Sequence, residues 1–271
     1  MKTHDNTILL SKLKEYLMNL GSLAVAFSGG VDSTFLTKAS FDALKNNLVA
    51  IIAYSPLIPK REYEEAIEFL ENSGIKYEVV EVNIEDIKSF TDNPLDRCYI
   101  CKGRIFSRII EAANMLGIRN IADGSNLDDQ QDYRPGSRAL KELGVLSPLK
   151  ELGFTKSNIR SISKEMGLPT WDKPAYACLA SRIPYGHEIT TEKLEAIDKG
   201  EQFLIDLGFK QMRVRHHMDI ARIEVPKEEF ARFSNEDMCN KIYEKFKELG
   251  FLYTALDIAG YRTGSMNEGI T

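Results

Sequence analysis

Cysteine, tryptophan and long apolar runs are all scarce in this sequence. Four cysteines and one tryptophan occur among 271 residues, too few cysteines for a disulfide-stapled scaffold. No apolar stretch approaches the roughly 20 residues that a membrane-spanning helix needs. The opening residues 1–6 are polar and lack the apolar core of a signal peptide. We therefore expect a cytoplasmic protein whose cysteines are reduced thiols or metal ligands.

Basic runs, low-complexity segments and internal repeats are absent as well. The net charge is −5, which argues against a protein built mainly to coat nucleic acid. The composition, 43% hydrophobic and 28% charged, is that of an ordinary globular chain. Its length accommodates one large domain, or a main domain with a smaller partner domain.

Short apolar runs alternate with amphipathic stretches through the first half of the chain. An opening helix is expected over 8–20, followed by a buried strand over 23–27. Further strands are predicted over 48–53, 77–82 and 120–122, with helices over 33–45, 60–72 and 102–116. This order predicts an α/β fold, a parallel sheet with helices on both faces. Ligands bind such sheets at the carboxyl ends of the strands.

The pattern changes near Thr190. A helix over 191–207 precedes strand-like runs over 211–215, 220–225 and 252–258, with a helical stretch before the last run. We predict a main domain over 1–189 and a small α+β domain over 190–271 for substrate binding or oligomerisation.

The turn Ser28-Gly29-Gly30-Val31-Asp32-Ser33 joins the first buried strand to a helix. Adjacent glycines allow a tight turn and close approach to an anion, and a helix start stabilises phosphate. Ser28 and Ser33 add hydroxyl donors, and Asp32 has the chemistry to hold Mg²⁺. The alternative is a plain turn capped by Asp32.

A second segment, Gly124-Ser125-Asn126-Leu127-Asp128-Asp129, follows a later strand. Its carboxylates could hold magnesium or orient a substrate beside a nucleotide, so Gly124 and Asp128 are candidate ATP-binding residues. The alternative is an acidic loop with an Asx turn.

Three cysteines complete the set of candidate catalytic residues. Cys98 and Cys101 form a C-x-x-C pair expected just ahead of a helix, whose dipole and nearby basic residues favour thiolate. Cys178 lies in a segment rich in proline, glycine and small residues. Three thiolates suit a [4Fe–4S] cluster with one open iron. A catalytic dithiol with Cys178 as resolving thiol, or inert cysteines, remain alternatives, and Cys239 is expected to pack in a helix.

The SGGVDS turn resembles the phosphate loop of the PP-loop ATP pyrophosphatases, which split ATP between its α and β phosphates. The segments DYRPG, CLASRIPYG, RVRHHMDIARIE and DIAGYRTGSMN together resemble the LarE family over nearly the whole chain. LarE proteins are sulfur transferases that help make the nickel-pincer nucleotide cofactor of lactate racemase. The resemblance implies ATP and Mg²⁺ as cofactors, a sulfide donor, and a homo-oligomer.

The family chemistry converts a carboxylate of pyridinium-3,5-biscarboxylic acid mononucleotide into a thiocarboxylate through an acyl-adenylate. Members that sacrifice a protein cysteine carry it at the position of Ala177 and lack the Cys98–Cys101 pair. This chain instead resembles the three-cysteine members, in which a [4Fe–4S] cluster carries the sulfur. The resemblance therefore implies a renewable sulfur source at Cys98, Cys101 and Cys178.

Two arginines of one predicted strand are candidates for binding the substrate's anionic groups. Arg213 and Arg215 stand at i and i+2, so both point to one face and could bind a phosphate or carboxylate bidentately. Arg134, Arg182 and Glu224 are the other candidate substrate-binding residues. A solvated or ion-paired surface role is the alternative for each arginine.

Three other functions share some of these features. A tRNA-thiolating enzyme combines the same loop with three cysteines, although neither a basic surface nor a zinc module accompanies them here. An ATP-dependent amidating synthetase needs the loop and no cysteine triad. A non-enzymatic nucleotide-binding module would never release pyrophosphate.

Overall fold

The computed structural model describes residues 2–87, 89–131, 135–174, 177–262 and 265–267. These residues divide into two compact units. The first comprises residues 1–55, 60–88 and 96–176, and the second comprises 56–59, 89–95 and 177–271. Residues 177–189, which the sequence analysis placed with the main domain, thus belong to the second unit. The reason is local, because Arg182 of this segment forms an ion pair with Glu201 of that unit.

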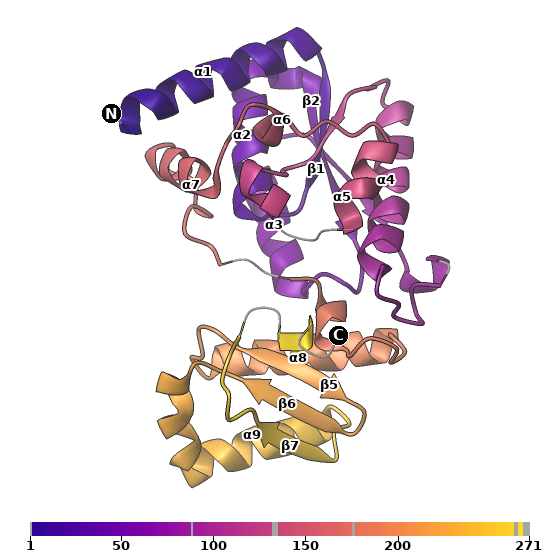
Figure 1. Ribbon diagram of the computed structural model, residues 1–271, viewed down its shortest axis with the longest axis vertical. Helices are drawn as coiled ribbons and strands as arrows, with labels where there is room; N and C mark the ends of the chain where they lie inside the picture. The colour runs from indigo at the N-terminus through magenta and orange to yellow at the C-terminus, as the bar shows by residue number, and fades with distance from the viewer. Residues whose placement is uncertain (1, 88, 132–134, 175–176, 263–264, 268–271) are drawn as a thin grey trace. The chain divides into compact units, whose positions relative to one another are not determined.

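The first unit is built around a four-stranded parallel sheet of order β3-β2-β1-β4 (Figure 1). Its strands are β1 (Leu23–Phe27), β2 (Leu48–Tyr54), β3 (Tyr77–Glu81) and β4 (Ile121–Ala122). Its helices are α1 (Lys2–Leu20), α2 (Val31–Leu44), α3 (Lys60–Asn72), α4 (Arg97–Met115), α5 (Pro135–Glu142), α6 (Pro148–Glu151) and α7 (Lys156–Glu165). Short 3₁₀ turns are η1 (Lys45–Asn47), η2 (Ile84–Asp86) and η3 (Leu127–Gln131). The predicted α/β fold is confirmed.

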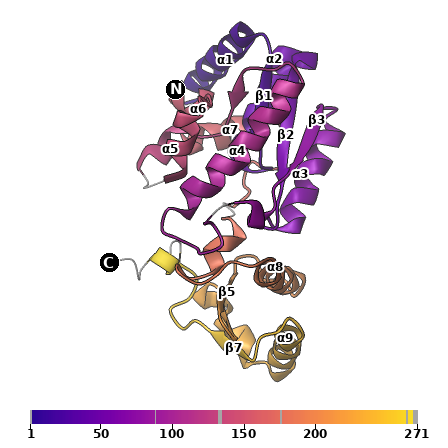
Figure 2. The same ribbon diagram turned by 90° about the vertical axis from the view of Figure 1, so that its right-hand side faces the viewer.

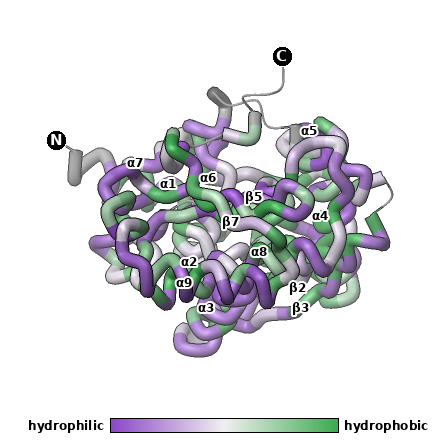
Figure 3. The backbone as a smooth tube through the Cα atoms, turned by 90° about the horizontal axis from the view of Figure 1, so that it is seen from below, coloured by the Kyte–Doolittle hydropathy of each residue, from purple (hydrophilic) through white to green (hydrophobic). Residues whose placement is uncertain are grey.

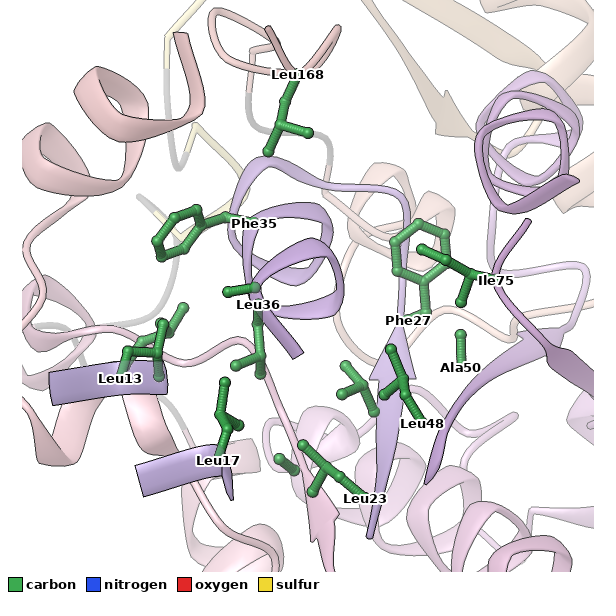
Figure 4. Close-up of a cluster of buried hydrophobic side chains, with 14 of the residues drawn as sticks. Leu13, Leu17, Leu23, Phe27, Phe35, Leu36, Leu48, Ala50, Ile75 and Leu168 are labelled. Atoms are coloured by element: carbon green, nitrogen blue, oxygen red, sulfur yellow. The ribbon is translucent and has the colours of Figure 1, made fainter. Parts of the chain in front are cut away.

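Helices cover both faces of this sheet because alternate strand residues point to opposite faces. Leu23 and Phe27 of β1 pack with Leu13, Leu17 and Phe35 from α1 and α2 (Figure 4). Helices α3 and α7 contribute to the same core. On the other face, strand residues pack against α4, which Figure 2 shows lying along the sheet. The parallel strands thereby bring their carboxyl ends, and the turns that follow them, to one end of the unit.

The second unit has a small mixed sheet of order β5-β6-β7. Strands β5 (Arg213–His217) and β6 (Ile220–Glu224) are antiparallel, whereas β7 (Tyr253–Leu256) runs parallel to β6. Two helices, α8 (Thr191–Asp206) and α9 (Glu236–Glu248), accompany the sheet, with 3₁₀ turns η4 (Leu179–Arg182), η5 (Lys227–Ser234) and η6 (Ser265–Asn267). This small α+β unit agrees with the predicted fold class.

Hydrophilic and hydrophobic residues are interleaved along the helices (Figure 3). This colouring reflects the one-sided burial of helices that pack on a sheet. Within the described part of the chain, no helix is both long enough and apolar enough to cross a membrane.

Candidate nucleotide and sulfur-transfer site

The SGGVDS turn folds as a tight loop between β1 and α2. Gly29 has a positive φ of 67°, and Gly30 is the extended N-cap of α2 without a side-chain capping bond. The Ser33 hydroxyl accepts the Ser28 N–H at 3.3 Å and lies 3.0 Å from the Ser28 hydroxyl. The two serines therefore hold the loop closed, and the first N–H groups of α2, which no side chain caps, can bind an anion.

Two glycines leave room around this loop that a side chain would fill. A Cβ at Gly29 would lie 2.8 Å from the Ala66 Cβ of α3. A Cβ at Gly124, after β4, would lie 2.9 Å from the Ser33 nitrogen. Both positions therefore require glycine, because Ala66 lies too close to Gly29, and the main chain at Ser33 lies too close to Gly124, for either to carry a side chain. These close approaches fit a loop that surrounds phosphate with main-chain donors.

Asp32 carries the carboxylate at the start of α2. Its Oδ2 accepts from Lys156 Nζ at 2.5 Å, and its buried Oδ1 has no hydrogen-bond partner among the described residues. Burial raises the pKa of Asp32 above its ordinary value; Lys156 opposes this rise, Asp129 adds to it, and the nearby Asn126 side chain lowers the pKa slightly. A buried carboxylate oxygen without a partner is chemically suited to a hard cation such as Mg²⁺.

The second acidic segment shapes the approach to Asp32. The Asn126 side chain accepts the Asp128 N–H at 2.9 Å, which is the Asx turn considered as the alternative. Asp128 Oδ2 in turn accepts the Lys156 N–H at the start of α7, at 2.8 Å. Asp128 therefore fixes the residue whose ammonium group contacts Asp32. A direct role for Asp128 in binding ATP stays a prediction.

Lys156 was missed by the sequence analysis. Thr155 and Asn158 form a capping box that starts α7 at Lys156, so the helix start was legible from the T-x-x-N pattern. The contact between Lys156 and Asp32 could not be predicted from the sequence, because the two residues are 124 positions apart. The Lys156 ammonium group counters the charge of the buried Asp32 carboxylate.

Changing Lys156 to methionine is expected to weaken Mg²⁺·ATP binding by about tenfold, as for the loss of one charge-assisted contact. The pKa of Asp32 is already raised, and removal of the cation raises it further. The acid limb of nucleotide binding should therefore move to higher pH, because Asp32 must be deprotonated to bind Mg²⁺. Titration calorimetry across pH measures both effects.

The matched control is Lys38→Met, which removes a Lys38–Asp42 pair that also measures 2.5 Å and lies within α2. It should leave nucleotide affinity and its pH profile unchanged. Equal behaviour of the two variants would contradict the role given to Lys156.

The C-x-x-C pair lies inside α4, which begins at Arg97 and not at the predicted 102. Cys98 and Cys101 therefore occupy the first turns of the helix at i and i+3, on one face. The reason for the earlier start is tertiary packing against α5. The Tyr99 hydroxyl donates to Glu142 at 2.6 Å, and the Arg138 guanidinium lies 3.9 Å from the Tyr99 ring centre.

All four cysteines lie in described parts of the chain, and none forms a disulfide. Cys98 is exposed and Cys101 half-buried in the first unit, whereas exposed Cys178 belongs to the second. The thiol of Cys239, in α9, donates to the carbonyl of Phe233, which precedes that helix, at 3.0 Å. Within the described ranges, no group of three His, Cys, Asp or Glu side chains forms a metal-binding cluster.

Arg182 is fully buried just after Cys178. Its Nε and one terminal nitrogen donate to the Glu201 carboxylate, each at 3.0 Å. Its other terminal nitrogen donates to the Ala177 and Cys178 carbonyls at 2.5 and 3.1 Å. These bonds fix the main chain at Cys178. Glu201, which sequence reasoning did not select, supplies the counter-charge that lets this arginine be buried.

Arg213 and Arg215 share one face of β5, as their spacing predicts. Arg215 donates to Glu224 of β6 at 2.7 Å and to the Ser265 hydroxyl at 3.0 Å. The Arg213 guanidinium lies 5.3 Å from the Tyr261 ring centre, and burial together with Arg182 lowers its pKa. Arg182 and Arg215 are each ion-paired to a buried glutamate, as the ion-paired alternative expects, whereas the Arg213 guanidinium donates to the Met212 carbonyl. Substrate binding by Arg182, Arg213, Arg215 and Glu224 stays a prediction.

Arg222 and Arg134 are two further arginines to be placed. Arg222 of β6, which sequence reasoning missed, forms ion pairs with Asp257 and with Glu224, the latter at 3.3 Å. Register on the antiparallel ladder, where Arg215 faces Arg222, could have suggested it. Arg134, predicted to contact the substrate, lies outside the described residues.

Comparisons with known proteins agree with the phosphate loop. The family profile described as NAD synthase matches residues 6–116. One component of the glutamine-hydrolyzing GMP synthase of Thermoplasma volcanium is 29% identical over 208 residues, 69% of this chain and 65% of that protein.

Two relatives match almost the full length. An uncharacterized protein of Synechocystis sp. is 42% identical over 262 residues, 97% of this chain and 98% of its own. The pyridinium-3,5-bisthiocarboxylic acid mononucleotide synthase of Lactiplantibacillus plantarum is 35% identical over 257 residues, 94% of this chain and 92% of its own. The chain therefore belongs to the LarE family of ATP-dependent sulfurtransferases, within the PP-loop superfamily.

Proposed function

We propose that this protein adenylates a carboxylate of pyridinium-3,5-biscarboxylic acid mononucleotide and replaces a carboxylate oxygen with sulfur. The similarity to the L. plantarum synthase over 94% of the chain carries the choice of substrate. The loop with its partnerless Asp32 oxygen, among the residues described, supports the ATP half of the reaction. The product would enter nickel-pincer cofactor biosynthesis.

The reaction balances in two steps. A substrate carboxylate oxygen attacks the α-phosphate of ATP, forming an acyl-adenylate and releasing pyrophosphate. Hydrosulfide then attacks the acyl carbon, AMP leaves with the former carboxylate oxygen, and a proton is released from sulfur. A carboxylate oxygen is a poor leaving group and AMP a good one, so the first step lowers the barrier of the second.

The chain's own groups divide this work. The main-chain N–H groups at the start of α2 would hold phosphate, and Asp32 would hold Mg²⁺. Arg213 and Arg215, buried on one strand face, would bind the substrate's phosphate or second carboxylate. Exclusion of water from the acyl-adenylate is needed because hydrolysis competes with sulfur transfer.

Cys98, Cys101 and Cys178 are the residues that would hold a [4Fe–4S] cluster. Three thiolates are the right donor type, and the start of a helix favours the anionic form at Cys98 and Cys101. When bound, such a cluster supplies sulfide at the iron that no protein ligand occupies. Cys239 is not needed, since its thiol is bonded to the main chain beside α9.

Anaerobic purification with iron and acid-labile sulfide analysis tests this ligand set. Wild-type protein and Cys239→Ala should carry near-stoichiometric cluster after reconstitution, and Cys178→Ala should lose it or bind it weakly. A wild-type protein that stays iron-free on reconstitution would rule the cluster out. The proposal would then retreat to a thiol mechanism at Cys178.

One observation favours a second candidate function. The GMP synthase component, similar over 69% of this chain, belongs to a glutamine-hydrolyzing enzyme by its name. An amidating synthetase would use the same ATP loop with ammonia as nucleophile and would need no cysteine. A triple Cys98, Cys101 and Cys178 to alanine variant with unchanged turnover would favour this function.

A further inference from the structure

Lys173 reaches from the segment ahead of Cys178 to the phosphate loop. Its Nζ lies 2.6 Å from Glu62 and 2.7 Å from Glu65, both on α3. The same nitrogen donates to the Gly29 carbonyl at 3.4 Å, a long contact. The Lys173 side chain is 13% exposed, so this ammonium group is held within the first unit and is not a solvated surface charge.

The bond to Gly29 has a consequence for the phosphate loop. A trans peptide places its C=O and its N–H on opposite sides. With the Gly29 carbonyl turned toward Lys173, the Gly30 N–H of the same peptide points away from that ammonium group. The arrangement keeps the carbonyl dipole off the phosphate side and presents a donor there, as anion binding requires.

The carboxylates behind Lys173 belong to the helix that packs against the loop. Glu62 is buried and also contacts Arg61 at 3.2 Å. Ala66, one turn further along α3, is the residue against which Gly29 packs. Lys173 therefore closes a cluster that includes both α3 and the loop.

The main chain at Lys173 is fixed from the other side by α7. Arg160 donates to the Trp171 and Lys173 carbonyls, each at 2.8 Å. One turn earlier on α7, Lys156 contacts Asp32. Residues 171–173 are thus bonded to α7 through Arg160, and to α3 and Gly29 through the Lys173 side chain.

We propose that Lys173 is a positioning residue that sets the Gly29 peptide for phosphate binding. This inference rests on the proposed function, because it takes SGGVDS as the ATP loop. Lys173 itself touches no reacting atom. Its effect is to hold the Gly29 carbonyl away from the phosphates, so that the Gly30 N–H faces them.

Three variants separate positioning from simple stabilisation. Lys173→Met removes the ammonium group but leaves Glu62 buried with one partner fewer, which lowers stability. Lys173→Met combined with Glu62→Gln also removes the carboxylate charge that has lost this partner, and should restore much of the melting temperature. Lys173→Arg retains the cation. The control is Lys164→Met. Lys164 is exposed, and its ammonium nitrogen lies 4.5 Å from the centre of the Trp171 ring, so this lysine contacts the neighbouring segment through a ring and does not contact the phosphate loop.

Two quantities are measured with each protein: the melting temperature, and the dissociation constant for Mg²⁺ with a non-hydrolysable ATP analogue. The dissociation constant should rise about tenfold in Lys173→Met and in the double variant, since small misplacements are costly in a preorganised site. Lys173→Arg should recover part of the affinity, and Lys164→Met should match wild type. Wild-type affinity in the double variant would overturn the inference.

The outcomes also distinguish this inference from the proposed function. If the wild type releases no AMP with the pyridinium substrate, the proposed function fails. The inference still stands or falls then on the affinity of Lys173→Met against Lys164→Met.

Discussion

Replacing Gly29 with alanine is expected to weaken Mg²⁺·ATP binding by at least about a hundredfold, because a misplacement of about 1 Å in a site costs that much. Gly29 has a φ of 67°, and an added Cβ would lie 2.8 Å from the Ala66 Cβ. Carbon atoms in contact normally stay about 3.5–4.0 Å apart. The loop must therefore move, and its N–H groups move with it. Calorimetry and pyrophosphate release measure the loss.

Gly21→Ala is the matched control for this change. Gly21 also has a positive φ, 73°, but nothing lies within 4 Å of an added Cβ. That variant should lose about 1–2 kcal/mol of folding free energy from the left-handed backbone alone and bind nucleotide normally. If Gly29→Ala bound ATP like Gly21→Ala, the loop would not be the nucleotide site.

Replacing Cys178 with alanine is expected to lower thiocarboxylate formation by at least about a hundredfold, the scale of losing a catalytic group. Adenylation should persist, because the loop proposed to bind ATP lies in the first unit and Cys178 in the second. The variant should therefore release AMP by hydrolysing its acyl-adenylate. Quantifying AMP, pyrophosphate and thiocarboxylate in the same reaction separates the two steps.

Cys178 is exposed, so its truncation should leave the melting temperature unchanged. Cys239→Ala, half-buried in α9, serves as the control and should retain sulfur transfer. Wild-type thiocarboxylate yields from Cys178→Ala would remove this residue from the mechanism. Loss of adenylation in the same variant would instead place Cys178 in the first step.

Features set by neighbouring residues were predictable from the sequence. The apolar run LAVAF predicted β1, the double glycine predicted the loop, and the i, i+2 spacing placed Arg213 and Arg215 on one strand face. Helix α3 was predicted with its observed bounds, because Lys60–Asn72 carries a clear amphipathic pattern. These signals depend on local periodicity and turn chemistry alone.

Features set by tertiary contact were not predictable in this way. Helix α4 starts at Arg97, well before its predicted start at 102, where Tyr99 contacts α5. Helices α5 to α7 received no prediction because they are short and follow irregular segments. The partnership of Lys173 with Glu65 spans 108 positions, and no local pattern reveals such a pair.

The reaction proposed for this protein is ATP-dependent replacement of a carboxylate oxygen by sulfur. Its most direct test is an anaerobic reaction of the reconstituted protein with ATP, Mg²⁺, sulfide and pyridinium-3,5-biscarboxylic acid mononucleotide, analysed by mass spectrometry. We expect a thiocarboxylate product, with AMP and pyrophosphate formed in proportion, and none when ATP is omitted. Substrate returned unchanged, or converted to an amide when ammonia is added, would contradict it.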